Sequence, residues 1–93
     1  MDVTITRFVP FEGAGPLKAF CDVAVGDLLI KGVRVIAGRQ GLLVRMPRQQ
    51  SKEGTWYDSV VPLSQAMKTE ISRVVLETFA QQARIGPPED RSA

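Results

Sequence analysis

The stretch Leu17–Ala37, LKAFCDVAVGDLLIKGVRVIA, joins two apolar runs through Gly26 and Asp27. In the first run apolar and polar residues alternate, as they do in a strand with one buried face. One face carries Leu17, Ala19, Cys21, Val23 and Val25, and the other carries Lys18, Phe20 and Asp22. Two turn-forming residues between such runs are typical of a two-residue hairpin. We therefore expect residues 17–25 and 28–37 to be antiparallel neighbours, with Cys21 in the core.

The second run is apolar on both of its faces. One face is expected to carry Leu29, Val33 and Val35, and the other Leu28, Ile30 and Ile36 together with Arg34. A strand of this kind is expected at the centre of a sheet with both of its faces covered. Gly32 lies inside the run, where glycine often marks a β-bulge or a close approach of another backbone.

Further strands are expected on either side of this hairpin. Residues 3–11 alternate and are rich in β-branched and aromatic side chains, and residues 12–16 form the connection. A turn over 38–41 leads into a strand over 42–46, and Pro47 weakens or ends the pairing because it lacks a backbone donor. A loop over 48–54 and a fifth strand over 55–61 follow, with Trp56 facing inward.

The C-terminal part predicts one long helix. Ser64 is a suitable N-cap residue, and the helix is expected to run to about Arg84 before Gly86, Pro87 and Pro88 stop it. Apolar residues at helical spacing give it a buried face, formed by Met67, Ile71, Val74, Val75, Leu76 and Phe79. The expected fold is α+β, an antiparallel sheet of about five strands followed by one C-terminal helix. We expect one domain over 1–85 and a flexible tail over 86–93.

Charge is distributed unevenly along the 93 residues, although the net charge is only +2. Residues 1–27 and 53–93 each have a net charge of −2, whereas residues 28–52 contain six bases and no acid. The surface made by this middle segment will attract anions. Lysine and arginine also protect strand edges against aggregation, so charge alone leaves the role of the segment open.

Several classes of function lack their usual residues in this sequence. There is no histidine and only one cysteine, which leaves the serines without an activating base and a zinc ion without a ligand set. No phosphate-binding glycine motif is present. We expect no enzymatic activity, no cofactor, no metal and no small-molecule substrate. The single cysteine, the N-terminus without a signal-peptide pattern and the absence of a long apolar run favour a cytoplasmic protein without membrane contact.

A combination of short motifs resembles the SpoVG family of bacterial septation and sporulation regulators. The matching segments are LKA (17–19), GVRVIAGRQGLLVRMP (32–47), Gly54, Trp56, Asp58 and PLS (62–64). The resemblance covers roughly residues 3–80. It implies a small α+β protein that forms a homodimer or higher homo-oligomer and regulates gene expression by binding DNA and, in some members, RNA.

The resemblance also implies where nucleic acid would bind. The family usually has a Lys-Arg pair after the MP motif and a further arginine before the aspartate, and here these positions are Gln49, Gln50 and Tyr57. Arg45 stands where the family usually has a small residue. The candidate nucleic-acid-binding residues of this chain are Arg39, Arg45, Arg48, Gln49, Gln50 and Lys52.

Two functional hypotheses remain open from the sequence. In the first, arginine and lysine neutralise phosphates, the glutamines hydrogen-bond phosphates or base edges, and Trp56 or Tyr57 stacks on an unpaired base. In the second, the glutamines mark a protein-interaction or structural dimer that has lost nucleic-acid binding. A partly apolar second face of the sheet favours a dimer under both hypotheses.

Overall fold

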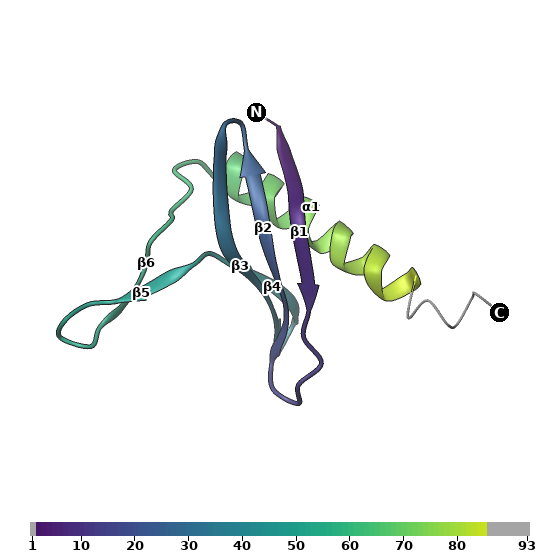
Figure 1. The fold of residues 1–93 in the computed structure, drawn as a ribbon, viewed down its shortest axis with the longest axis horizontal. Helices are drawn as coiled ribbons and strands as arrows, with labels where there is room; N and C mark the ends of the chain where they lie inside the picture. Colours follow the sequence, from purple (N-terminus) through teal and green to yellow (C-terminus); the bar gives the residue numbers. More distant parts are fainter. Residues whose placement is uncertain (1, 86–93) are drawn as a thin grey trace.

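The computed structural model describes residues 2–85, which form six strands and one helix (Figure 1). The expected tail over 86–93 lies outside the described residues. The elements are β1 (Val3–Pro10), β2 (Leu17–Val25), β3 (Leu28–Gly38), β4 (Gly41–Arg45), β5 (Arg48–Gln50), β6 (Trp56–Asp58) and α1 (Gln65–Ile85). The α+β class with a terminal helix is confirmed. The expected fifth strand is shortened to β6, and β5 lies in the segment expected to be a loop.

Strands β1 to β4 form one antiparallel sheet in chain order. Val25 pairs with Leu28 across the two-residue turn, as the Gly26-Asp27 pair predicted. Gly26 has a φ of 59°, a left-handed conformation that glycine adopts without the steric cost of a Cβ. Pairing of β3 with β4 begins at Gly38 and Gly41 and ends at Arg45, two residues before Pro47.

Helix α1 lies across one face of the sheet and closes the hydrophobic core (Figure 1). Its N-terminus is capped as predicted, because the backbone N–H of Met67 donates to Ser64 Oγ at 3.0 Å. Among residues 2–82, nine hydrophobic residues are buried, and Cys21 is one of them: Ala19, Cys21, Val23, Val25, Ile30, Val33, Val35, Ile71 and Val75. This is a thin core, as expected of a chain this short.

A β-bulge at Gly32 corrects the predicted faces of β3. Cys21 pairs with Val33 and Val23 pairs with Ile30, so two residues of β3 oppose Asp22 alone. Gly32 has a φ of 84° and its N–H donates to Asp22 Oδ1 at 3.2 Å. The extra residue reverses the alternation. Ile30 therefore joins Val33 in the core, and Leu29, expected beside Val33, is 50% exposed.

The face of the sheet opposite α1 is not covered by any described element. Val9, Phe20 and Arg34 lie in one row of pairs across β1, β2 and β3, and Ile36 pairs with Leu43 in the next row. Phe20 and Leu43 remain 38% and 44% exposed. The prediction that β3 is covered on both faces is therefore wrong for the single chain. We call Val9, Phe20, Ile36 and Leu43 the outer patch.

Residues 48–58 differ from the expected loop and inward-facing strand. Arg48–Gln50 pairs with Trp56–Asp58 in a separate two-stranded hairpin, which projects away from the sheet (Figure 1). Trp56 is 55% exposed, so its expected place in the core is wrong. The strand over 55–61 is only three residues long, because its one partner within residues 2–85 is the equally short β5.

Candidate nucleic-acid interface

The β5–β6 hairpin is ordered by its own backbone and side chains. The N–H of Ser51 donates to the carbonyl of Thr55 at 2.8 Å, and Gly54 turns the chain with a φ of 89°. At the base of the hairpin, the N–H of Ser59 donates to the carbonyl of Pro47 at 2.9 Å. Lys52 lies in the turn and is exposed. The hairpin therefore presents a lysine at the end furthest from the sheet.

The two faces of the hairpin carry different chemistry. Register places Arg48 opposite Asp58 and Gln50 opposite Trp56 on one face, while Gln49 lies opposite Tyr57 on the other. The hydroxyl of Tyr57 donates to Gln49 Oε1 at 2.9 Å. Gln50 Nε2 donates to the carbonyl of Gly54 at 3.1 Å, leaving its own Oε1 free of described contacts. Both glutamines are thus fixed in position and each keeps hydrogen-bonding capacity for a ligand.

Two arginines meet where the sheet joins the hairpin. Arg34 on β3 and Arg45 on β4 are directly opposite in the register. Like charges in this arrangement repel. Arg34 Nη2 donates to the carbonyl of Met46 at 3.0 Å, which fixes one guanidinium over the end of β4. The repulsion would be relieved by an anion bound between the two side chains.

The structure groups five of the six candidate residues. Arg48, Gln49, Gln50 and Lys52 are on the hairpin, and Arg45 is at its base. Arg39 lies in the turn at the opposite end of β4, so it is separated from the hairpin by the length of that strand. All six are exposed, as a binding role requires. Their role in binding stays a prediction.

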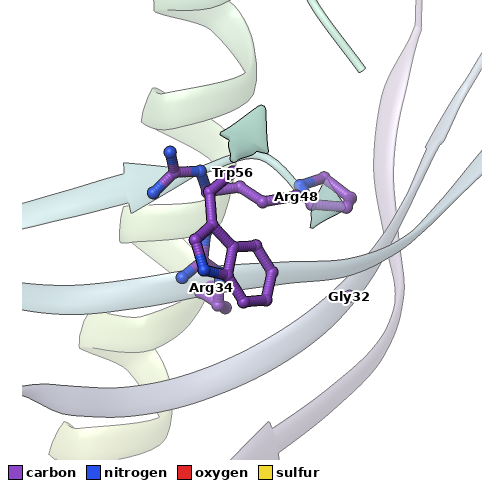
Figure 2. A pocket seen from close by; sticks show the side chains of 5 residues that line it. Gly32, Arg34, Arg48 and Trp56 are labelled. Carbon is purple, nitrogen blue, oxygen red and sulfur yellow. The ribbon is translucent and has the colours of Figure 1, made fainter. Parts of the chain in front are cut away.

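Arg34 and Trp56 join this region, although neither is among the six candidates. Together with Gly32, Pro47 and Arg48 they line a pocket of about 520 Å³ between β3 and the hairpin. Figure 2 shows the indole of Trp56 directed from the hairpin towards Arg34. The signal available in the sequence was the one-sign charge of residues 28–52, which includes Arg34.

Ion pairing leaves most of the charge in this region free. Arg48 Nε lies 3.4 Å from Asp58 Oδ1, and both side chains are about half exposed. Exposed pairs of this kind contribute only about 0–1 kcal/mol, so phosphate can compete for Arg48. Among the residues that the structure describes, Arg45 and Lys52 make no ion pair.

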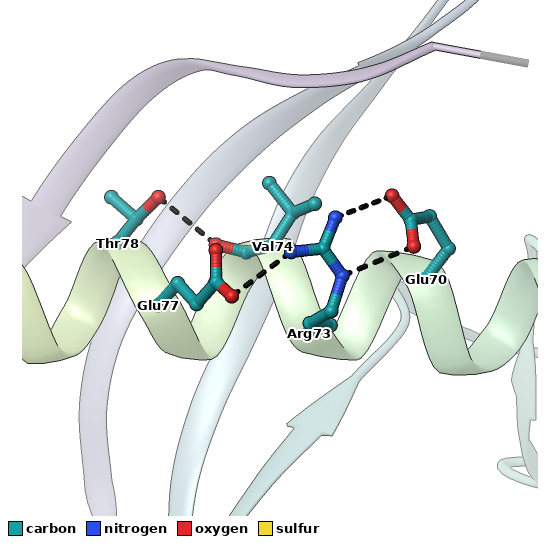
Figure 3. Close-up of polar contacts among 5 residues, drawn as sticks. All are labelled: Glu70, Arg73, Val74, Glu77 and Thr78. Atoms are coloured by element: carbon teal, nitrogen blue, oxygen red, sulfur yellow. Dashed lines mark hydrogen bonds and ion pairs between the residues drawn. The ribbon is translucent and has the colours of Figure 1, made fainter.

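Arg73 on the outer surface of α1 differs from the hairpin arginines because two glutamates neutralise it. Arg73 bonds Glu70 at 2.7 Å and Glu77 at 2.9 Å (Figure 3). The hydrogen bond from Arg73 lowers the pKa of Glu70, so the carboxylate keeps its charge. Arg73 and Glu77 are four residues apart, so they lie on the same side of the helix. In the described part of the chain, the hairpin and its base therefore carry unpaired positive charge at Arg45 and Lys52, whereas the charge of Arg73 on the helix is paired.

Comparison with known sequences identifies the family of this chain. The sequence model of the SpoVG family matches residues 1–81. The chain belongs to the SpoVG family. SpoVG proteins are regulatory and are not known as enzymes.

Three relatives illustrate the range of SpoVG sequences, and all are named as candidate septation proteins. The Archaeoglobus fulgidus protein is 30% identical over 82 residues, which cover 87% of this chain and 96% of the relative. The Symbiobacterium thermophilum protein is 32% identical, over 92% of this chain and 62% of the relative. The Listeria monocytogenes protein SpoVG 1 is 29% identical, over the whole of this chain and 92% of the relative.

Two departures from the usual SpoVG pattern lie against each other in the structure. Gln49 and Tyr57, at positions where the resemblance implied basic residues, form a hydrogen bond across the hairpin. The face with Arg48 and Trp56 is thereby left as the charged face of the hairpin. In the part of the chain that the structure describes, no helix is long and apolar enough to cross a membrane.

Proposed function

We propose that this SpoVG protein is a homodimeric regulator of gene expression that binds DNA or RNA through its projecting hairpin. The observation that carries the proposal is the gathering of Arg48, Gln49, Gln50 and Lys52 on one hairpin, with Arg45 at its base. These side chains are exposed and lie beyond the packed body of the molecule. A projecting basic hairpin can follow a phosphate backbone without rearrangement of the core.

The chemistry divides between charge and hydrogen bonding. Arg45, Arg48 and Lys52 neutralise phosphates and release counterions, which gives an affinity that falls as salt rises. Gln49 and Gln50 supply neutral donors and acceptors for phosphates or base edges. Contacts with the phosphate backbone of the nucleic acid therefore supply most of the affinity, and any preference for sequence depends on the glutamines.

The homodimer rests on the outer patch. Phe20 and Leu43 are exposed on a sheet face that no described element covers, above a core of nine buried hydrophobic residues. Burying apolar surface stabilises a complex by roughly 25 cal/mol per Å² before the entropic cost of association. A second copy of this chain is the proposed occupant, because it would extend the thin core and pair one basic hairpin with another.

Nucleic-acid binding is tested by fluorescence anisotropy with labelled DNA and RNA. The triple variant Arg45→Ala, Arg48→Ala and Lys52→Ala should bind at least tenfold more weakly than wild type at low salt. A matched control removes the same number of positive charges outside the 28–52 segment through Arg7→Ala, Lys18→Ala and Arg73→Ala, and it should retain most of the affinity. Equal binding by wild type and the triple variant, or no binding by wild type, would sink the proposal.

A protein-interaction or structural dimer without nucleic-acid binding is the second candidate. The Gln49–Tyr57 hydrogen bond and the Arg48–Asp58 ion pair favour it, because side chains that bond to each other within the hairpin are less available to nucleic acid. A pulldown that recovers protein but no nuclease-sensitive material would support this candidate. Nucleic acid that co-purifies, visible in the ultraviolet absorbance spectrum, would support binding instead.

A further inference from the structure

The pocket between β3 and the hairpin combines two guanidinium groups with an exposed indole. Arg34 and Gly32 come from β3, whereas Pro47, Arg48 and Trp56 come from the hairpin (Figure 2). The volume of about 520 Å³ lies within the range of roughly 300–1,000 Å³ found for small-ligand pockets. Its walls are held in place by the bulge on one side and by the Ser59–Pro47 bond on the other.

Each lining group has capacity that the described contacts leave unused. Arg34 is half-buried and uses one N–H on the carbonyl of Met46, which leaves other donors of its five for a ligand. Trp56 exposes 55% of a side chain that is usually largely buried. At Gly32 a Cβ would meet no atom within 4 Å, so the space above the bulge is open.

We propose that this pocket binds a single unpaired nucleotide of a nucleic-acid strand, with its base against Trp56 and its phosphate between Arg34 and Arg48. The inference rests on the proposed function and specifies which form of nucleic acid the site takes. Every base has a flat face that stacks on an indole, and guanidinium groups bind phosphate through paired hydrogen bonds. In a duplex the base is already stacked between its neighbours, so the pocket selects single strands.

The position of the pocket suits this role. Arg45 lies at the base of the hairpin and Lys52 in its turn, with Arg48 and Trp56 on the two strands between these ends. A strand that contacts both Arg45 and Lys52 therefore passes Trp56. The outer patch extends from the row of Arg34 towards the β3–β4 turn, away from Gly32. A second copy on that patch would leave the Gly32 side of the pocket free for nucleic acid.

Trp56 is the one tryptophan of the chain, so intrinsic fluorescence reports directly on this site. The protein is titrated with a single-stranded oligonucleotide, a duplex of the same sequence and the free mononucleotide. We expect the single strand to quench the fluorescence, and to bind at least tenfold more tightly than the duplex. The free mononucleotide should bind far more weakly, because it lacks the contacts of the neighbouring phosphates. Quenching by the mononucleotide at the same concentration as the strand would overturn the inference in favour of a free-nucleotide site.

Substitutions separate this site from the rest of the hairpin. Stacking on an aromatic side chain contributes about 1–3 kcal/mol per base, so Trp56→Leu should weaken single-strand binding by about 5- to 150-fold. Trp56→Phe should retain part of the affinity, and Arg34→Ala should weaken binding more than Arg34→Lys. The control is Leu63→Ala, at a fully exposed leucine outside the hairpin and the pocket, which should leave single-strand binding unchanged.

The outcomes distinguish this inference from the proposed function. Binding by wild type without a change in fluorescence, and with equal affinity in Trp56→Leu, would overturn the pocket while leaving the regulator proposal intact. Failure of wild type to bind any nucleic acid would overturn both. Loss of single-strand binding in Trp56→Leu with duplex binding retained would support the pocket specifically.

Discussion

At Gly32 the backbone of β3 adopts a φ of 84°, and Asp22 accepts a hydrogen bond from its N–H at 3.2 Å. This local contact determines which side chains of β3 face the helix. It moves Ile30 into the core and leaves Arg34 on the face that borders the hairpin. One residue in a left-handed conformation therefore connects the packing of the core with the position of the candidate site.

Replacing Gly32 with alanine should destabilise the protein. A non-glycine residue in the left-handed region costs about 1–2 kcal/mol of stability. A Cβ at this position would meet no atom within 4 Å, so the strained backbone conformation is the only expected cause of the loss. Denaturant unfolding measures the change. Gly15→Ala is the control, because a Cβ there also meets nothing and no left-handed φ is required. Equal stabilities of the two variants would contradict the role given to the bulge.

The thiol of Cys21 should make stability depend on alkaline pH. Burial, assisted by the charge of Asp22, raises its pKa from 9.0 to about 11. The unfolded chain therefore loses this proton at a lower pH than the folded chain. The contribution of the protonated thiol to the free energy of unfolding is complete below pH 9, and it is lost as the pH rises towards 11.

Unfolding free energies across that window test the linkage. The stability advantage of wild type over Cys21→Ala should shrink as the pH rises, because alanine has no proton to lose. All other titrating groups are common to both proteins and cancel in the difference. A difference that stays constant with pH would show that burial of the thiol has no such effect.

Among the elements, the hairpin shows why sequence patterns predict some parts better than others. The β2–β3 turn and the Ser64 cap depend on neighbouring residues, and both were predicted correctly. The pairing of β5 with β6 depends on contacts across a turn, and Gln49 and Gln50 have weak strand preference. The local pattern therefore suggested a loop there.

The site residues were also predicted well where they are neighbours in the chain and poorly where distant segments meet. The resemblance and the one-sign charge of the segment predicted a group that includes Arg45, Arg48, Gln49, Gln50 and Lys52. The structure keeps these five together because they are close in the chain. Arg39 is close in sequence but lies beyond β4. Arg34 was missed as a site residue, and Trp56 was considered for stacking but expected in the core, because a bulge and a projecting hairpin bring the two together from separate segments.

Helix α1 should be sensitive to loss of its cap. Ser64→Ala removes the oxygen that accepts from the N–H of Met67, which should cost about 1 kcal/mol. Ser64→Asp should restore the stability, because aspartate also caps and its charge suits a helix N-terminus. Thermal and denaturant unfolding measure both variants, and the exposed Gln81→Ala serves as a neutral control. An unchanged stability of Ser64→Ala would rule out a stabilising cap.

For the whole molecule, the apolar outer patch and the basic hairpin are adjacent, and Arg34 lies between them. Arg34 is in the same row of pairs as Phe20, and it also lines the hairpin pocket. Dimerisation through the patch would therefore fix two hairpins relative to each other. Two linked sites bind a longer strand more tightly than either site alone, provided that their spacing matches it.

The dimer should depend on Leu43. Introducing a carboxylate through Leu43→Glu places a charge on the outer patch, and burying an unpaired charge is strongly unfavourable. Light scattering should then find a dimer for wild type and a monomer for the variant. Leu63→Glu, at a fully exposed leucine before the helix, should remain dimeric. A monomeric wild type, or a dimeric Leu43→Glu, would contradict this interface.

The central claim is that the hairpin and its base bind nucleic acid through phosphate contacts. The most direct measurement is the dependence of duplex DNA affinity on salt concentration, for wild type and for the variant with alanine at Arg45, Arg48 and Lys52. The slope of log affinity against log salt should become shallower by about 0.9 for each phosphate contact removed. The account predicts a shallower slope and weaker binding in the variant; identical slopes and affinities would contradict it.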